Sequence, residues 1–136
     1  MPTVFSKIVS GEIPAHKVAE TNDFLAFMDV RPLRDGHVLV IPKEETDAIF
    51  DVEDEHYIGL WMFAKIVAQG IKQAFPCPKV GVAVIGLEVN HAHIHLIPIH
   101  QVGDMDFSKP KLTPTDEVLA EHAASIKEAI LGITGN

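Results

Sequence analysis

The chain has 136 residues, of which 47% are hydrophobic and 22% charged, a composition typical of one globular domain. Its formal net charge of −8 argues against a broad nucleic-acid surface, although a local pocket could still take a small phosphorylated ligand. No run approaches the ~20 apolar residues of a membrane span. The one cysteine, Cys77, excludes an intrachain disulfide, and no export signal is visible, so we expect a cytoplasmic protein. No repeat or linker divides the chain, which predicts a single domain over residues 1–136.

The first third of the chain predicts an antiparallel meander. The segment SKIVSGEIPAHKV favours a short helical turn followed by an extended stretch, because Gly11 and Pro14 interrupt its apolar pattern. The runs HKVAET and FLAFMDV flank Asn22–Asp23, a pair typical of hairpin turns. RPLRDG is a predicted loop with a turn signal at its end, and HVLVIP predicts a strand that ends at Pro42.

A long amphipathic helix is predicted over residues 54–75. Asp51 and Asp54, three residues apart, indicate its N-terminus, and Glu53 and Glu55 add acidic groups to the first turn. Its buried face follows from the helical spacing of Leu60, Ala64, Val67, Ile71 and Ala74. A second apolar flank, suited to the sheet or to a second subunit, consists of Tyr57, Trp61 and Ala68.

Two more strands and a second helix complete the predicted pattern. VGVAVIG and NHAHIHLIPI predict strands over residues 80–86 and 90–99. Thr113–Pro114 and Asp116 predict a helix start with proline at the first helical position, and Gly132 predicts its end. The apolar face of this helix consists of Leu119, Ala123, Ile126 and Ile130. The order of elements predicts an α+β fold with an antiparallel sheet.

Three histidines alternate with apolar residues in the last predicted strand. Because strand side chains alternate between faces, His91, His93 and His95 share one face. The other face is small and apolar, suited to packing under a helix, and carries Ala92, Ile94, Leu96 and Pro98. Three imidazoles on one face could be structural histidines, metal ligands or groups that act on a phosphate.

The residue types and their spacing bear on each of these three alternatives but do not decide between them. Burying three structural histidines requires three sets of hydrogen-bond partners. One metal ion is difficult to share, because His91 and His95 would lie about 13 Å apart along a strand, and the chain has no CxxC or HExxH motif. A phosphate site suits the pattern, since a neutral imidazole nitrogen can attack phosphorus while a neighbouring ring stabilises the developing charge.

The segment HAHIHLI resembles the signature of the histidine triad (HIT) superfamily of nucleotide hydrolases and transferases, in which three histidines alternate with hydrophobic residues. VFSKIVSGEIPAHKV, FLAFMDVRP and DGHVLVIPK resemble further family segments in the expected order, so the resemblance covers residues 4–99, and residues 100–136 are less diagnostic. It implies a HIT-like α+β fold: an antiparallel meander sheet of about five strands with a long central helix and a C-terminal helix.

The resemblance implies a role for each matching residue. His93 would be the nucleophile that attacks the α-phosphate, His95 would donate hydrogen bonds to the phosphate oxygens, and His91 would support the local geometry. His37 matches a further family histidine beside the triad. Asp29 matches an acid that accepts hydrogen bonds from the ribose hydroxyls, a task for which a carboxylate is suited. Without the family, His37 would be a histidine at a strand start and Asp29 a turn residue.

The remaining expected substrate-binding residues are apolar positions and one loop. Around the base and ribose the resemblance implies Ile8, Ile13, Phe27 and Val30, which would otherwise be assigned to the core. Gly86 fits a position where the backbone approaches a phosphate. Glu88 stands where phosphoramidase relatives usually have a small hydroxyl residue that helps the leaving group. An ionised glutamate would repel a phosphate there, a protonated one could act as an acid, and a solvated loop residue would do neither.

One departure from the family concerns zinc. Many bacterial relatives bind a structural zinc ion through two cysteines of a CxxC motif, a later histidine and the first triad histidine. Here the corresponding positions hold Thr3, Ser6 and Glu45, and only His91 remains. Hydroxyl groups and one carboxylate are poor replacements for thiolates, so we predict no zinc and no other cofactor.

The expected function is that of a cytoplasmic enzyme that binds purine nucleotides and releases a nucleoside monophosphate through a nucleotidyl-histidine intermediate. The bond cleaved would be that of a phosphoramidate, an acyl phosphate or a dinucleoside polyphosphate. A catalytically weak nucleotide-binding or scaffolding protein is the alternative, since the same residues would serve it. The resemblance also implies a homodimer, with the helix over residues 54–75 as candidate interface, and neither nucleic acid nor membrane is expected as a partner.

Overall fold

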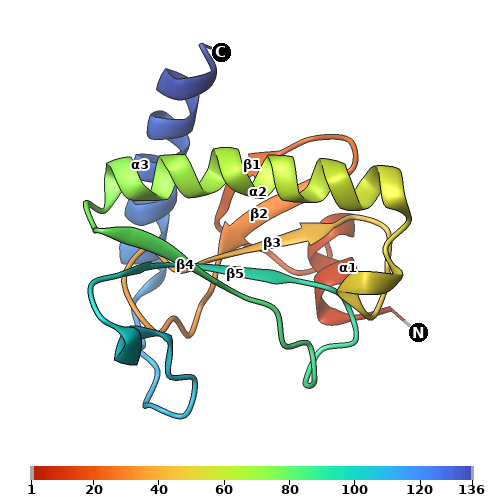
Figure 1. The fold of residues 1–136 in the computed structure, drawn as a ribbon, viewed down its shortest axis with the longest axis horizontal. Coiled ribbons are helices and arrows are strands. Elements are labelled where there is room, and N and C mark those ends of the chain that lie inside the picture. The colour runs from red at the N-terminus through yellow and green to blue at the C-terminus, as the bar shows by residue number, and fades with distance from the viewer. Residues whose placement is uncertain (1, 136) are drawn as a thin grey trace.

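The computed structural model describes residues 2–135 and contains one antiparallel sheet (Figure 1). Its five strands are β1 (Lys17–Glu20), β2 (Phe24–Met28), β3 (Val38–Pro42), β4 (Lys79–Ala83) and β5 (Ile94–Ile99). The helices are α1 (Val4–Ser10), α2 (Asp54–Ala74) and α3 (Asp116–Thr134), with short 3₁₀ turns η1 (Ile49–Asp51) and η2 (Val102–Met105). The predicted α+β fold with five antiparallel strands, a long helix and a C-terminal helix is confirmed.

The strand order is β1-β2-β3-β5-β4, so the chain forms a meander only over its first three strands. From β3 the chain passes through α2 to the sheet edge, forms β4, and returns as β5 between β3 and β4. Strand β5 therefore pairs with β3 on one side, Leu39 opposite His95, and with β4 on the other, Ala83 opposite His95. This central place makes β5 a rigid support for any residue that it carries.

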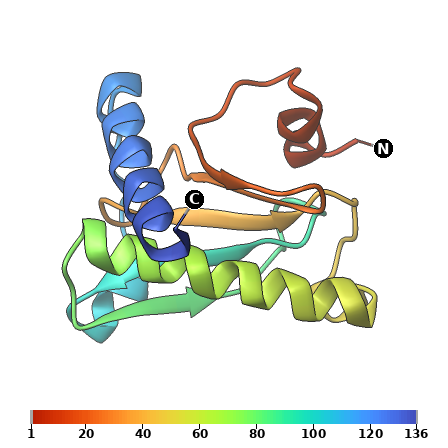
Figure 2. The same cartoon turned by 90° about the horizontal axis from the view of Figure 1, so that it is seen from above.

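The two faces of the sheet have different covers. Helices α2 and α3 pack on one face, as two perpendicular views show (Figures 1 and 2). The buried residues beneath them include Ala92, Ile94 and Leu96, which confirms that this side of the histidine segment packs under a helix. Helix α1 and two long loops cover the other face, where Phe5 and Ile8 pack on Leu25 and Phe27.

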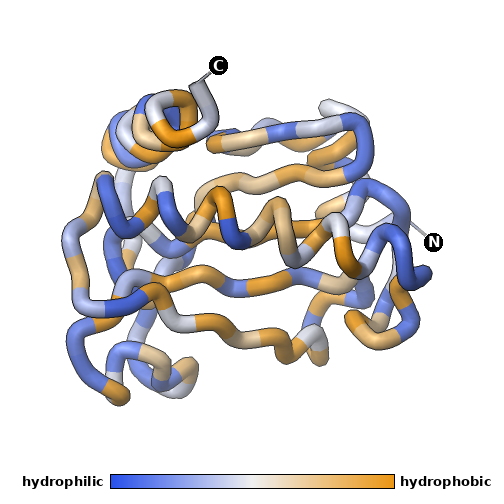
Figure 3. Tube along the Cα trace, turned by 45° about the horizontal axis from the view of Figure 1, so that its top comes forward, coloured by the Kyte–Doolittle hydropathy of each residue, from blue (hydrophilic) through white to orange (hydrophobic). Residues whose placement is uncertain are grey.

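Hydropathy follows this layering. The central strands are mainly hydrophobic along the trace, whereas hydrophilic residues recur along the outer sides of the helices (Figure 3). In α2 the buried residues include Leu60, Ala64, Val67 and Ile71, as the helical spacing predicts. Within residues 2–135, no helix combines the length and the apolar character needed to cross a membrane.

Three element boundaries differ from the sequence predictions. The N-cap of α2 is Glu53, because the chain first makes the 3₁₀ turn η1, which contains Asp51. The N-cap of α3 is Thr115, whose hydroxyl accepts from the Val118 N–H, so Pro114 lies one residue before the cap. Helix α3 continues through Gly132, and its end is set by Gly135 in a left-handed conformation.

The predicted strand over residues 90–99 is also shorter than expected. Strand β5 begins at Ile94, so His91 and His93 belong to the irregular segment before it, and only His95 lies within the strand. Strand β4 likewise ends at Ala83 rather than at residue 86. The pairing of β5 with β3 ends at Ile94 and that of β4 with β5 ends at Ala83, and the segment between them forms a loop on the face opposite α2.

Candidate active site

Strands β2, β3 and β5 bring together residues that are distant in sequence. Asp29 follows the last residue of β2 and His37 precedes the first residue of β3, and the Asp29 N–H donates to the His37 carbonyl at 3.1 Å. His95 lies in β5 opposite Leu39, two residues beyond His37 along the neighbouring segment. Asp29, His37 and His95 therefore meet at one end of three paired strands.

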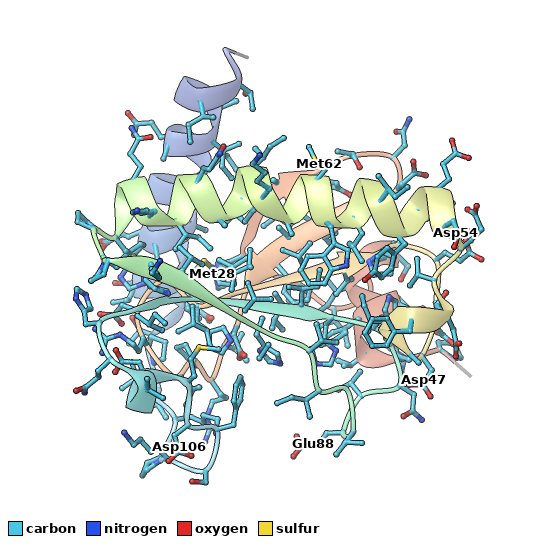
Figure 4. The ribbon with its side chains drawn as sticks, in the orientation of Figure 1. Met28, Asp47, Asp54, Met62, Glu88 and Asp106 are labelled. Atoms are coloured by element: carbon cyan, nitrogen blue, oxygen red, sulfur yellow. The ribbon has the colours of Figure 1, made fainter. Side chains whose placement is uncertain are left out.

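A cavity of about 720 Å³ opens at this place, a volume within the usual range for small-molecule sites. Two loops border it, one between β4 and β5 and one between η2 and α3; Glu88 and Asp106 mark them on the side of the sheet opposite α2 (Figure 4). All the predicted site residues except His91 line this cavity: Ile8, Ile13, Phe27, Asp29, Val30, His37, Gly86, Glu88, His93 and His95.

Hydrogen-bond direction determines the tautomers of His37 and His95. The Leu33 backbone N–H can only donate, and it lies 3.0 Å from His37 Nδ1, so this nitrogen carries no hydrogen. The hydrogen of His37 is then on Nε2, which lies 2.9 Å from His95 Nδ1 and donates to it. His95 accordingly carries its hydrogen on Nε2, the nitrogen on the far side of the ring from His37.

His93 has the opposite tautomer. Its Nδ1 lies 2.7 Å from the His91 carbonyl, which can only accept, so Nδ1 carries a hydrogen, and in the neutral ring Nε2 carries the lone pair. The ring is 7% exposed and lies against the edges of Phe5 and His95, with centroid distances of 5.0 Å to each. A neutral imidazole with a free lone pair is a nucleophile, and this one lines the cavity.

Burial keeps the neighbouring histidines neutral. It lowers the pKa of His37 to about 3 and the pKa of His95 to about 4, and nearby positive charge, including Lys111, acts in the same direction. Burial raises the pKa of Asp29, whose Oδ1 accepts from the Arg31 N–H at 2.9 Å and whose Oδ2 lies 3.5 Å from His37 Nε2. At neutral pH, His95 thus offers a neutral N–H to a ligand.

His91 lies beside the cavity but does not line it. Its Nε2 lies 2.8 Å from the Pro42 carbonyl and its Nδ1 lies 2.9 Å from Thr3 Oγ1, so both ring nitrogens bind protein atoms. The ring is fully buried, and burial lowers its pKa. The three histidines are therefore unequal in what they can offer to a ligand, and only His93 and His95 are available to one.

The loop before the histidine segment contains Gly86 and Glu88. Gly86 has φ of +70°, a left-handed conformation that glycine adopts without strain, and a side chain here would have open space. The backbone conformation accounts for a glycine here, and the close approach of this backbone to a phosphate stays a prediction. Glu88 is exposed near the tip of the loop and projects away from the sheet (Figure 4).

Sequence reasoning missed the contribution of residues 100–115. The ring centroids of Phe107 and His95 lie 4.8 Å apart. Lys111 lines the cavity, and its ammonium group donates to the Phe107 carbonyl. This loop is anchored by Asp104, which pairs with Arg34 at 3.1 Å and accepts from the His100 N–H. Two lysines among two prolines give no periodic signal, so only the folded loop identifies Lys111 as a residue of the site.

Two groups of side chains could be considered for a metal ion. Asp29, His37 and His95 offer ligand atoms within 4.8 Å of one another. A metal on His37 Nε2 would require the hydrogen of that ring on Nδ1, where the Leu33 N–H already points. This conflict argues against a metal ion at these three residues.

The second group consists of Thr3, Ser6, Glu45 and His91, at the positions to which the family resemblance assigns a structural zinc site. Thr3, Ser6 and Glu45 do meet at His91, but their side chains are already hydrogen-bonded within the protein: Ser6 donates to Glu45, and Thr3 Oγ1 lies 2.9 Å from His91 Nδ1. Two hydroxyl groups already committed to hydrogen bonds are poor zinc ligands, so the donor set does not fit the metal. The absence of zinc stays a prediction for metal analysis of the purified chain.

Comparisons with known proteins place this architecture in a family. The model of the HIT domain matches residues 10–102. The chain is 34% identical to an uncharacterized HIT-like protein of Methanocaldococcus jannaschii, over 87% of this chain and 96% of that protein. It is 36% identical to an adenosine 5′-monophosphoramidase of Schizosaccharomyces pombe, over 72% of this chain and 74% of that protein.

The fold agrees with solved structures. A crystal structure of a Hit-like protein involved in cell-cycle regulation from Bartonella henselae superposes with a TM-score of 0.83 at 30% identity, covering 93% of this chain and 95% of that one. The architecture is thus that of the HIT fold. The chain belongs to the HIT family, without the cysteines of the zinc-binding members.

Proposed function

We propose that this protein is a purine nucleotide hydrolase and nucleotidyl transferase that cleaves at the α-phosphate through a nucleotidyl-His93 intermediate. The observation that carries the proposal is the tautomer of His93. Its hydrogen is held by the His91 carbonyl, so Nε2 is left as a nucleophile beside a cavity large enough for a nucleotide. Neutral His95 beside it supplies an N–H for the phosphate oxygens.

The reaction proceeds in two displacements. His93 Nε2 forms a bond to the α-phosphorus as the bond to the leaving group breaks, and the leaving group departs with the electron pair and takes up a proton. Water then attacks the phosphorus and gives up a proton to the solvent, the bond to Nε2 breaks with its electron pair returning to the ring, and a nucleoside monophosphate is released. His95 donates its Nε2–H to a non-bridging oxygen, and His37 fixes this direction through its own hydrogen bond.

The proposed nucleotide orientation follows the chemistry of the lining. The Asp29 carboxylate accepts from the ribose hydroxyls, while Ile8, Ile13, Phe27 and Val30 offer apolar surface to the base and ribose. Lys111 adds a positive charge on the side of His95. The phosphoramidase name of the Schizosaccharomyces pombe relative supports a phosphorus–nitrogen bond as substrate and adenine as base.

Two alternatives to this function would use the same cavity. A dinucleoside polyphosphate would use the same nucleophile with a larger anionic leaving group. A catalytically weak nucleotide-binding protein would keep the pocket without accumulating an adduct. The cytoplasm as its location and the homodimer as its state are further proposals from the family resemblance.

The decisive experiment follows turnover of a fluorogenic adenosine phosphoramidate by the parent protein and by His93→Ala. Loss of turnover in the variant, with an adenylylated parent protein detected by intact mass, supports the proposal. Exposed His100 provides a matched control as His100→Ala, which should retain activity. Equal turnover by His93→Ala and the parent would show that His93 is not the nucleophile. A panel of amidates, acyl phosphates and dinucleoside polyphosphates then ranks the leaving groups.

A further inference from the structure

A continuous chain of hydrogen bonds leads from the surface to His91. It begins at exposed Glu45, in the segment after β3, and passes through Ser6 and Thr3 at the start of α1. Ser6 Oγ donates to Glu45 Oε1, and the Thr3 backbone N–H donates to the same carboxylate oxygen at 3.1 Å. Thr3 Oγ1 lies 2.9 Å from His91 Nδ1. Four residues from three segments therefore form one network.

The direction of each bond in this network is determined by its ends. The Pro42 carbonyl accepts from His91 Nε2–H at 2.8 Å, so in the neutral ring Nδ1 has a lone pair and must accept from the Thr3 hydroxyl. At the other end the Glu45 carboxylate can only accept, which commits the single hydrogen of Ser6 to Glu45. The Thr3 hydroxyl is then free to donate its own single hydrogen to His91.

Helix capping does not explain the whole network. Thr3 and Ser6 form a capping box, in which Thr3 Oγ1 accepts from the Ser6 N–H and Ser6 Oγ accepts from the Thr3 N–H, each at 3.0 Å. That motif is complete without Glu45 and without His91. The additional bonds join α1 to Glu45, in the segment after β3, and to His91, whose carbonyl accepts from His93 Nδ1.

We propose that Glu45, Ser6 and Thr3 are positioning residues that hold His91 with its hydrogen on Nε2, and that this fixes the carbonyl which orients the nucleophile His93. The backbone around His91 is held at a second point, because the Ala92 N–H donates to the Thr46 carbonyl at 2.7 Å. The His91 side chain and the Ala92 backbone are thus hydrogen-bonded to Pro42 and Thr46, which flank Glu45 in the sequence. The kinetic part of this inference rests on the proposed function, whereas the tautomer part does not.

Two substitutions of Thr3 separate capping from donation. Serine and aspartate are both good N-cap residues, so Thr3→Ser and Thr3→Asp should both retain α1. Serine can donate to His91 Nδ1, whereas an aspartate carboxylate can only accept. In Thr3→Asp the His91 ring must therefore supply the hydrogen itself and become protonated on both nitrogens.

The first readout is the hydrogen placement of His91 and His93, measured at pH 7 by two-bond ¹H–¹⁵N spectra of the labelled protein. We expect His91 to carry its hydrogen on Nε2 in the parent and in Thr3→Ser, and on both nitrogens in Thr3→Asp. His93 should be protonated on Nδ1 in the parent. This measurement does not depend on any substrate, so it tests the network even where the proposed reaction is wrong. An unchanged His91 ring in Thr3→Asp would overturn the inference.

The second readout is steady-state kinetics with the phosphoramidate. Misplacement of the nucleophile should reduce kcat of Thr3→Asp by about tenfold or more while KM changes less than about twofold. Thr3→Ser should keep the kcat of the parent. Glu45→Gln should show a smaller loss in kcat, because the amide oxygen of glutamine can still accept from Ser6 and from the Thr3 N–H, although more weakly than a carboxylate. Glu44→Gln, at the adjacent exposed glutamate, is the matched control and should behave as the parent. Equal kcat values for Thr3→Ser and Thr3→Asp would contradict the positioning role.

Discussion

His93 and His95 are two residues apart and have the same side chain, yet the fold prepares them for opposite tasks. A carbonyl acceptor at Nδ1 leaves His93 with a lone pair on Nε2, whereas a donated hydrogen at Nδ1 leaves His95 with an N–H on Nε2. Burial keeps His95 neutral, so it donates to a ligand without bringing a full positive charge. At the scale of residues, the chemistry depends on hydrogen-bond direction more than on residue type.

A first prediction concerns Asp29. Asp29→Asn removes the charge and one acceptor, so KM for a ribonucleotide substrate should rise about tenfold or more, as expected for loss of a charged hydrogen bond. A 2′,3′-dideoxy substrate has no ribose hydroxyls to donate, and the parent and the variant should show equal KM values for it. Steady-state kinetics with both substrates measures the effect. An equal rise in KM for the two substrates would mean that Asp29 does not bind the ribose.

At the scale of elements, the two long helices illustrate where local sequence signals are sufficient. The buried faces of α2 and α3 follow from apolar spacing, and both faces are confirmed. The α3 end does not follow, because Gly132 resembles a stop signal but lies within a helix that Gly135 terminates. Helix ends depend on which residue can adopt the left-handed conformation at the place where packing ceases, and two nearby glycines satisfy the local rule equally.

The second prediction compares two glycines in these helices. A methyl group at Gly70 in α2 would lie 2.5 Å from Ile130 Cγ1 of α3, so Gly70→Ala should lower the free energy of unfolding by about 1–3 kcal/mol. Gly132→Ala places a methyl group where nothing lies within 4 Å, and the higher helix propensity of alanine should raise that free energy by up to about 1 kcal/mol. Urea unfolding at one protein concentration measures both variants. A stabilised Gly70→Ala would show that α2 and α3 do not pack this closely.

At the scale of the whole molecule, the fold removes several histidines from water at once. His37, His91 and His95 are each less than 10% exposed, and burial lowers the pKa of each. The unfolded chain exposes the same rings, which then titrate near 6.5. Below that pH the unfolded state binds more protons than the folded state, so the free energy of unfolding must fall as the pH falls.

The third prediction follows from this difference. The free energy of unfolding should be highest above about pH 6.5 and should fall between pH 6.5 and about pH 4, with up to about 1.4 kcal/mol per pH unit from each of His37 and His95. His37→Asn should reduce this slope, whereas His100→Asn, at an exposed position, should leave it as in the parent. Urea titrations at pH 5, 6 and 7 measure the slope. A slope that is unchanged in His37→Asn would contradict the assignment.

A fourth prediction concerns the expected homodimer. Ile58 and Met62 on α2 are 64% and 55% exposed, and Met62 projects from the side of the helix that faces away from the sheet (Figure 4). If α2 is the interface, light scattering should give twice the chain mass of 14.9 kDa for the parent. Met62→Glu should lower the mass toward that of one chain, and Ser125→Glu, on the exposed side of α3, should not. A parent protein with the mass of one chain would exclude the dimer.

The sequence by itself determined the α+β fold, the hairpin at Asn22–Asp23, the buried faces of the helices and the identity of ten of the residues that line the cavity. These features depend on local conformational preference, apolar periodicity and family motifs, all of which are properties of short segments. The match to FLAFMDVRP, DGHVLVIPK and HAHIHLI was sufficient to select Asp29, His37, His93 and His95.

Only the tertiary structure decided how those residues differ from one another. Strand β5 begins at Ile94 because pairing with β3 begins there, and His91 consequently faces Thr3 and Pro42 instead of the cavity. Lys111 and Phe107 reach the site because Asp104 anchors their loop to Arg34. Hydrogen-bond direction, burial and loop anchoring arise between segments that are distant in sequence, so no pattern within one segment contains them.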